Sequence, residues 1–263
     1  MNDFTVLSDY WSVLPYYGGK SKLARRYSRP KNDLIIEPFA GGAAYSLRYW
    51  NRNVWLNDLN EQTVAAWRFL TSGDAALRLV RRHIPLDVAP GTPLSDLIRD
   101  DYPDDFKSFI HANMAKGAFG MRSTRRRVSP FGAMAWSSAA NGAGGLRDKC
   151  EYWIPKLRHW KITMLPYDQL PDVAGTWFID PPYDNAAGRK YAKADLDYRY
   201  LANWCRLRQG QVIVTENVGA TWLPFQPLTR KRIGIYSGNV RSSIGEAVYE
   251  QDDDGQDEWP AVQ

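Results

Sequence analysis

Sulfur and imidazole ligands are scarce in this chain. Its only two cysteines, Cys150 and Cys205, lie far apart, and its three histidines are His83, His111 and His159. None of the histidines has a cysteine or a carboxylate at the spacing that metal sites use. We therefore expect no metal site, and so few cysteines are typical of a protein of the reducing cytoplasm.

Long apolar runs are also missing. No run reaches the roughly 18 residues that a membrane-spanning helix needs. The first residues, MNDFTVLSDYWS, lack the basic start and long apolar segment of a secretory signal. These absences predict a cytoplasmic protein that has no membrane partner.

The composition that remains is that of a folded domain with a basic surface. Hydrophobic residues make up 44% of the 263 residues and charged residues 24%, which excludes a wholly disordered chain. The net charge of +5 permits a polyanionic partner such as nucleic acid but does not require one. Residues 251–263 contain the acidic run QDDDGQDE, which predicts a solvated tail and leaves the rest of the chain more basic.

Strand-like and helix-like segments alternate at both ends of the chain. Short apolar runs predict strands, and the segments between them predict helices, at residues 33–37 (strand), 43–50 (helix), 53–58 (strand), 61–70 (helix), 161–165, 176–180 (strands), 196–208 (helix) and 211–215 (strand). Such alternation favours an α/β fold with a doubly wound, mostly parallel, Rossmann-like sheet.

The alternation stops between the two ends. Residues 72–160 contain prolines, glycines and clustered arginines in place of strand-like runs, which predicts an inserted, smaller, mainly helical domain. Residues 1–71 and 161–250 would then form one discontinuous domain, followed by the acidic tail at 251–263. The basic run at 122–127 is either a nucleic-acid surface or a solvated face.

Two polar clusters follow the first two predicted strands, where ligands bind in an open parallel sheet. In Glu37-Pro38-Phe39-Ala40-Gly41-Gly42, the glycines allow the backbone to approach a ligand closely, and Glu37 is placed to meet a cationic group. Asp58 lies roughly 20 residues after that turn, where a carboxylate commonly accepts hydrogen bonds from ribose hydroxyls. Without a ligand, the same residues would be a tight turn and a helix N-terminal aspartate.

The cluster Asp180-Pro181-Pro182-Tyr183 is the most informative one. Consecutive prolines stiffen the backbone and remove two amide donors, so the turn presents carbonyl oxygens, a carboxylate and an aromatic ring together. An exocyclic amine such as adenine N6 is a poor nucleophile until acceptors orient it and enrich its nitrogen. The cluster therefore predicts a site for such an amine, and the alternative is a rigid turn.

At this point the sequence resembles the alpha-order (D12 class) DNA N6-adenine methyltransferases, which include bacterial GATC adenine methylases and phage enzymes. The motifs that carry the resemblance occur in the order of that family. They are Pro15-Tyr16-Tyr17-Gly18-Gly19-Lys20, the Glu37 turn, the insertion, Asp180-Pro181-Pro182-Tyr183, and the closing stretches 212–217 and 231–249.

The resemblance implies transfer of a methyl group from S-adenosylmethionine to adenine N6 in double-stranded DNA, with S-adenosylhomocysteine as product and no metal. It places the reaction in a bacterial or phage-infected cell. The donor would be held by Tyr16, Lys20, Glu37, Phe39, Ala40, Gly41, Asp58 at the ribose, Asp168 at the adenine, and Asp180. The catalytic residues would be Asp180, Pro181, Pro182 and Tyr183, with Tyr183 stacking on a flipped base.

The resemblance also assigns the insertion to target recognition. DNA contacts are expected from Arg122, Arg125, Arg126, Arg127 and Arg241. Related enzymes that methylate glutamine or RNA usually begin the catalytic motif with asparagine, and cytosine methylases with serine, so Asp180 favours DNA adenine. A DNA-binding relative without activity and an RNA methyltransferase are the alternatives. Whether recognition is site-specific or relaxed, and whether the enzyme serves restriction, phage protection or regulation, stays open.

Overall fold

The computed structural model describes residues 12–16, 18–21, 23–114, 127–128, 130, 133, 145–186, 188–191, 193, 195–229 and 245–252. In these residues one sheet has the strand order β3-β2-β1-β4-β5-β7-β6. The strands are β1 (Leu34–Glu37), β2 (Asn53–Asn57), β3 (Lys161–Thr163), β4 (Gly175–Ile179), β5 (Gly210–Asn217), β6 (Gln226–Thr229) and β7 (Glu246–Gln251).

Strands β1 to β5 are parallel, and β7 runs antiparallel to β5. Strand β1 lies between β2 and β4, so the strand order reverses there and opens a crevice at the carboxyl ends of β1 and β4. All five residues of β4 are buried, as in a parallel strand covered on both faces. The predicted α/β, doubly wound, mostly parallel sheet is confirmed.

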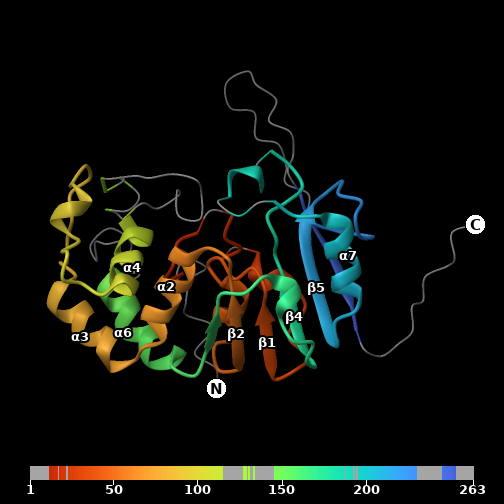
Figure 1. Cartoon of the computed structure of the whole chain (residues 1–263), viewed down its shortest axis with the longest axis horizontal. Helices are drawn as coiled ribbons and strands as arrows, with labels where there is room; N and C mark the ends of the chain where they lie inside the picture. Colours follow the sequence, from red (N-terminus) through yellow and green to blue (C-terminus); the bar gives the residue numbers. More distant parts are fainter. Residues whose placement is uncertain are drawn as a thin grey trace, which may run out of the picture.

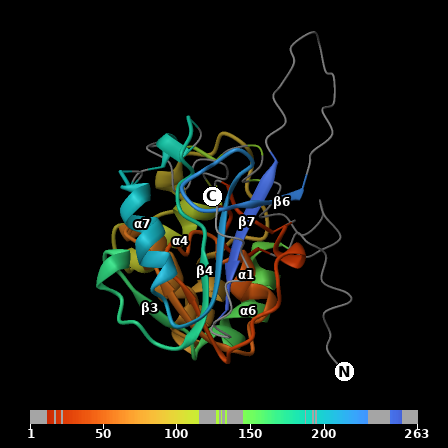
Figure 2. The ribbon, with the colours of Figure 1, turned by 90° about the vertical axis from the view of Figure 1, so that its right-hand side faces the viewer.

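Helices cover both faces of the sheet (Figures 1 and 2). Along β1, Ile35 packs into one hydrophobic core and Ile36 into the other, because successive strand side chains point to opposite faces. Helix α7 covers the Ile36 side, and α1 and α2 cover the Ile35 side. The helices are α1 (Ala44–Arg48), α2 (Glu61–Thr71), α3 (Asp74–His83), α4 (Asp104–Met114), α6 (Leu146–Leu157) and α7 (Tyr198–Arg206), and the short 3-10 helices are η2 (Ala24–Arg26), η3 (Leu94–Asp96), η4 (Tyr167–Gln169) and η5 (Gly188–Lys190).

The described part of segment 72–160 is mainly helical and lies beside α2 (Figure 1). The ring of Phe69 on α2 packs on Phe106 and Phe109 of α4, with 4.9 Å between ring centroids in both pairs. These residues belong to the same hydrophobic core as Ile35 of the sheet. The helices of the segment are therefore attached to the sheet domain through a continuous core.

The carboxyl-terminal strands extend further than the sequence pattern predicts. Strand β7 includes Gln251, which pairs with Val212, and Asp252 forms a 2.6 Å ion pair with Lys31. The acidic segment thus begins inside the sheet, because backbone pairing with β5 holds its first residue. No helix in the described ranges is long and apolar enough to cross a membrane.

Candidate active site

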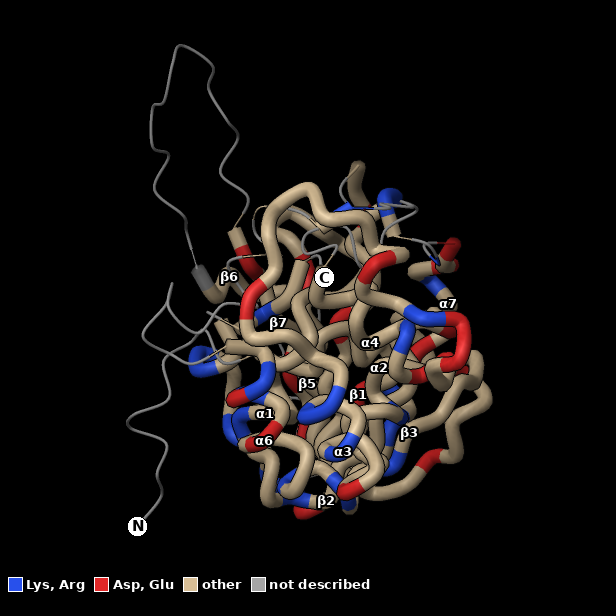
Figure 3. The backbone as a smooth tube through the Cα atoms, turned by 90° about the vertical axis from the view of Figure 1, so that its left-hand side faces the viewer, with Lys and Arg blue, Asp and Glu red and all other residues tan. Residues whose placement is uncertain are grey.

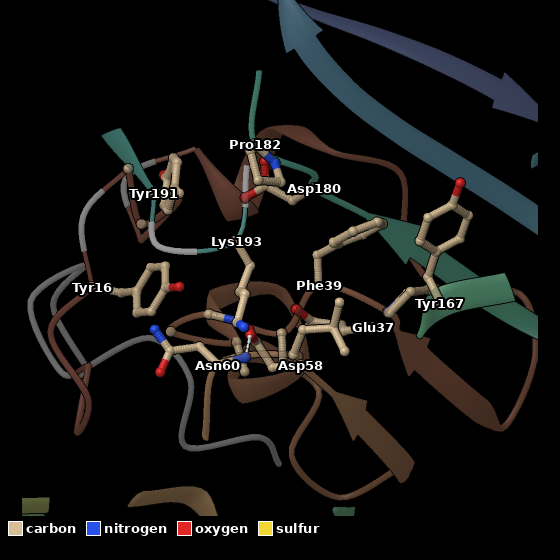
Figure 4. Close-up of a pocket in the computed structure, with 18 of the residues that line it drawn as sticks. Tyr16, Glu37, Phe39, Asp58, Asn60, Tyr167, Asp180, Pro182, Tyr191 and Lys193 are labelled. Carbon is tan, nitrogen blue, oxygen red and sulfur yellow. Dashed lines mark hydrogen bonds between the residues drawn. The ribbon is translucent and has the colours of Figure 1, made fainter. Parts of the chain in front are cut away.

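A cavity of about 210 Å³ opens beyond the carboxyl ends of β1 and β4 (Figure 4). It lies where the strand order reverses, which is the usual position of a ligand in such a sheet. Four predicted clusters meet there: the opening motif, the Glu37 turn, Asp58 and the catalytic motif. The lining residues are Tyr16, Gly18, Gly19, Lys20, Glu37, Pro38, Phe39, Ala40, Gly41, Gly42, Ala43, Ala44, Asp58, Leu59, Asn60, Tyr167, Phe178, Asp180, Pro182, Tyr191, Lys193, Asp195 and Leu196.

The turn after β1 requires glycine at position 41. Gly41 has a φ of +46°, and a Cβ there would lie 3.0 Å from Cδ1 and Cε1 of Tyr16. The Gly41 amide donates to Asp58 Oδ2 at 2.9 Å, and its carbonyl accepts from the Trp67 indole at 2.8 Å. The turn is thus held against the end of β2 and against α2, with its backbone facing the cavity.

Asp58 ties the two strand ends together. Its Oδ1 accepts the Asn60 amide at 2.8 Å, while Oδ2 accepts the Gly41 amide. Burial raises the pKa of Asp58 to about 6, against the lowering effect of the backbone donors at Asn60 and Gly41. The carboxylate is therefore fixed in orientation at the cavity wall, and unused lone pairs remain for a ligand hydroxyl.

Glu37 is a buried acid at the end of β1. Its side chain accepts the Ser46 amide of α1 at 2.8 Å, and only 2% of the residue is exposed. Burial raises the pKa of Glu37 to about 8, and Asp180 adds to the rise. At neutral pH the carboxyl group therefore binds a proton, which an entering cation would displace.

This pKa predicts how stability depends on pH. Because the folded protein binds a proton at Glu37 that the unfolded chain releases near pH 4.5, the free energy of unfolding should fall as pH rises from about 4.5 to 8. Glu37→Gln keeps an acceptor for Ser46 and removes this titration. We expect the melting temperature of the donor-free wild type to fall more steeply between pH 5 and pH 9 than that of the variant. Parallel melting curves in calorimetry would contradict this.

Lys20 and Asp180 join the opening motif to the catalytic motif. The Lys20 ammonium lies 2.7 Å from Oδ1 and 3.0 Å from Oδ2 of Asp180, and it is largely buried. Thr215 of β5 donates to Asp180 Oδ1 at 2.7 Å. Two donors thus orient Asp180. A carboxylate oxygen commonly accepts two hydrogen bonds, and Oδ2 accepts one here, so one acceptor position on Oδ2 is left for a ligand.

The turn Asp180-Pro181-Pro182-Tyr183 is anchored from both sides. The Tyr198 hydroxyl of α7 donates to the Pro182 carbonyl at 2.7 Å. The Tyr183 hydroxyl donates to Glu246 of β7, and the Lys20 ammonium lies 4.5 Å from the centroid of the Tyr183 ring. Pro182 lines the cavity, and the flanking Pro181 and Tyr183 are not among the described residues that line it.

Asp168 is the predicted donor contact that the structure does not bring to the cavity. It is exposed on η4, while its neighbour Tyr167 points inward and lines the cavity. Neighbouring residues of the one-turn helix η4 point in different directions, so Tyr167 is buried at the cavity and Asp168 is exposed. The Tyr167 and Phe39 rings lie 5.3 Å apart and form an aromatic wall (Figure 4).

Of the predicted DNA contacts, only Arg127 lies within the described residues. Its guanidinium Nη1 donates to the Gly91 carbonyl at 2.9 Å, and the residue is exposed and not among the described residues that line the cavity. The other four, Arg122, Arg125, Arg126 and Arg241, lie outside the described ranges.

Sequence reasoning missed the segment that follows the catalytic motif. Tyr191 and Lys193 line the cavity, and the Tyr191 ring stacks on Tyr16 with 6.0 Å between centroids. The Tyr191 hydroxyl occupies the space beside Gly18, where a Cβ would lie 2.1 Å from it. The glycine in the opening motif is a signal for such a close approach, but the sequence does not show which residue makes it.

The sheet order and the cavity at its switch point define a Rossmann-like methyltransferase fold. The family model described as D12 class N6 adenine-specific DNA methyltransferase matches residues 16–79, from the opening motif into α3, and confirms the resemblance. This match supports methylation of adenine N6 in DNA as the general activity. A search among curated proteins found no match.

Proposed function

We propose that the protein transfers the methyl group of S-adenosylmethionine to adenine N6 in double-stranded DNA. The observation that carries this proposal is the meeting of Lys20 and Asp180, 160 positions apart, at the cavity that the Asp58 and Gly41 pair also lines. In this proposal, the donor site and the turn that binds the amine share one cavity.

The residues of the cavity fit this donor. Asp58 presents a fixed carboxylate for ribose hydroxyls, and the bare backbone of Gly41 permits close approach of a ligand. Phe39 and Tyr167 offer an aromatic wall for a purine. Glu37 and Asp180 supply carboxyl groups toward a cation. The bound donor supplies a methyl group already activated on a sulfonium, so no metal is needed.

Asp180 and the turn after it would handle the target amine. One acceptor position on Asp180 Oδ2, together with the Pro181 carbonyl, matches the two hydrogens of an exocyclic amine. Both acceptors would take hydrogen bonds from the amine, which enriches the nitrogen and orients its lone pair toward the methyl group. The N–C bond forms as the S–C bond of the donor breaks, which leaves S-adenosylhomocysteine, and the methylated amine then releases one proton. Since adenine N6 is paired inside a duplex, the base must be turned out of the stack to reach this site.

The test is methyl transfer to defined DNA. The protein is incubated with methyl-labelled S-adenosylmethionine, excess chelator and duplex DNA that lacks N6-methyladenine, and the nucleosides are then separated by mass spectrometry. We expect label in N6-methyladenine alone. Label in RNA or cytosine, DNA binding without transfer, or activity that returns only with a divalent ion would each overturn the proposal. Sequencing of the modified DNA would show whether one site or many are methylated.

We further propose that segment 72–160 recognises DNA and that its basic run contacts phosphates. On the face where α3 and α6 lie, lysines and arginines alternate with acidic residues (Figure 3). Acidic residues on this face would repel DNA phosphates. We therefore assign phosphate binding to the basic run at 122–127, which contains no acidic residue. Arg127 is tethered to Gly91 and thereby attaches the end of this run to the helical segment.

Replacing Arg125, Arg126 and Arg127 by alanine tests this assignment. Each lost phosphate contact should flatten the salt dependence of DNA affinity by about one unit of slope, so the triple variant should lose about two to three units. Donor affinity should stay unchanged, because the donor is proposed to bind among Tyr16, Gly41 and Asp58, and Arg127 is not among the described residues that line this cavity. Fluorescence anisotropy across a salt series measures the slope. An unchanged slope would make these arginines a solvated face and move the DNA surface toward Arg241.

A further inference from the structure

A buried carboxylate that the proposed reaction does not use lies beside the catalytic motif. Glu246 begins β7 and pairs with Asn217 of β5, and its side chain is 9% exposed. Its Oε1 accepts hydrogen bonds from the Tyr183 hydroxyl and, at 2.8 Å, from the Tyr27 hydroxyl. Its location under the catalytic turn is decided by the antiparallel pairing of β7 with β5.

The groups around Glu246 form a ring of hydrogen bonds that one longer ion pair closes. Thr215 donates its single proton to Asp180, and the Tyr183 hydroxyl lies 3.3 Å from the Thr215 oxygen. The ring closes through Lys20, which pairs with Asp180 and lies 3.9 Å from Glu246 Oε1. Because a phenol has one proton, Tyr183 satisfies its donor at Glu246, so this carboxylate determines the orientation of the hydroxyl.

The alternative acceptor for Tyr183 is the weaker one. The Thr215 oxygen is a neutral acceptor at a longer distance, whereas Glu246 offers a carboxyl oxygen. Tyr27, which packs edge-on against Phe178 with 5.1 Å between ring centroids, holds Glu246 from the other side. The hydrophobic core thus fixes Tyr27, Tyr27 holds Glu246, and Glu246 holds the Tyr183 hydroxyl.

We propose that Glu246 is a positioning residue that holds the Tyr183 ring in the orientation in which the catalytic turn receives the target base. This inference rests on the proposed function, because the base is the substrate proposed above. Glu246 is not among the described residues that line the cavity, so it would act through Tyr183.

Two substitutions at Glu246 test how strongly kcat depends on the hydrogen bond to Tyr183. Glu246→Leu removes the acceptor, and we expect kcat to fall about 30-fold while donor affinity changes by less than about 2-fold. Glu246→Gln keeps a neutral acceptor and should recover most of that loss. The matched control is Glu250→Gln on the same strand, whose exposed carboxylate accepts from Ser28, and its activity should equal that of the wild type.

A double-mutant cycle separates positioning from a general structural role. In a Tyr183→Phe background the hydroxyl is already absent, so Glu246→Leu should cost less than about 3-fold more. An equal loss in both backgrounds, or donor affinity falling in step with kcat, would overturn the proposal. So would full activity of Glu246→Leu.

A spectroscopic measurement that needs no catalytic activity tests the proposal even if one variant does not fold or the proposed activity is absent. 3-Fluorotyrosine placed at position 183 reports the ring environment by ¹⁹F NMR without any substrate. We expect the resonance to shift in Glu246→Gln and to stay in place in Glu250→Gln; an unshifted resonance in Glu246→Gln would overturn the proposal even if Glu246→Leu does not fold. If the wild type transfers no methyl group to DNA, the proposed function fails, and the NMR comparison still tests whether Glu246 sets the environment of the Tyr183 ring.

Discussion

Asp180→Ala should lower the rate of methyl transfer at least about 10³-fold, because it removes the acceptor that would orient and enrich the target amine. The substitution also removes the partner of the buried Lys20 ammonium and the acceptor of the Thr215 hydroxyl. Single-turnover measurements with saturating donor and DNA isolate this step from binding.

The fold should survive this substitution. Glu246 lies 3.9 Å from the Lys20 ammonium and remains as a nearby carboxylate, so we expect stability to fall by only about 1 to 3 kcal/mol. Asp180→Asn should melt close to the wild type and still transfer slowly. Asp184→Ala, an exposed acid in the same loop, is the control and should keep full activity. A near wild-type rate for Asp180→Ala would remove Asp180 from the catalytic role.

Gly41→Ala should weaken donor binding about 100-fold, which corresponds to about 2.7 kcal/mol. The new Cβ would lie 3.0 Å from two atoms of the Tyr16 ring, so the turn or the ring must move, and both line the cavity proposed to hold the donor. Displacing the turn also disturbs the bond between the Gly41 amide and Asp58. Isothermal calorimetry with S-adenosylmethionine measures the effect.

Gly91→Ala is the matched control for backbone strain. Gly91 also has a positive φ, +84°, but a Cβ there meets no atom within 4 Å. It should therefore lose stability through strain and keep donor affinity. If the two variants bind the donor equally well, close packing at Gly41 is not what shapes the site.

Much of the sheet was predictable because its strands carry their own signal. The core of each run at 33–37, 53–58 and 176–180 became a strand, since buried parallel strands consist of short apolar segments. The pattern of apolar residues did not predict the antiparallel strands β6 and β7. Their residues are partly polar, and their pairing with β5 joins segments that no local periodicity connects.

The sequence by itself determined the strand, turn and helix around residues 37–42, the position of Asp58 after the next strand, and the proline turn that follows Asp180. These features are local, because they depend on backbone freedom at glycine and proline and on the alternation of apolar residues. Only the tertiary structure decided that Lys20 pairs with Asp180, that Tyr167 and not Asp168 faces the cavity, and that Glu246 lies beneath Tyr183. The contacts of Lys20 and Glu246 join elements that are distant in the chain. The orientation of Tyr167 depends on which side of a short helix packs inward. In each case the packing of the folded core decides the arrangement, and the neighbouring residues in the sequence do not.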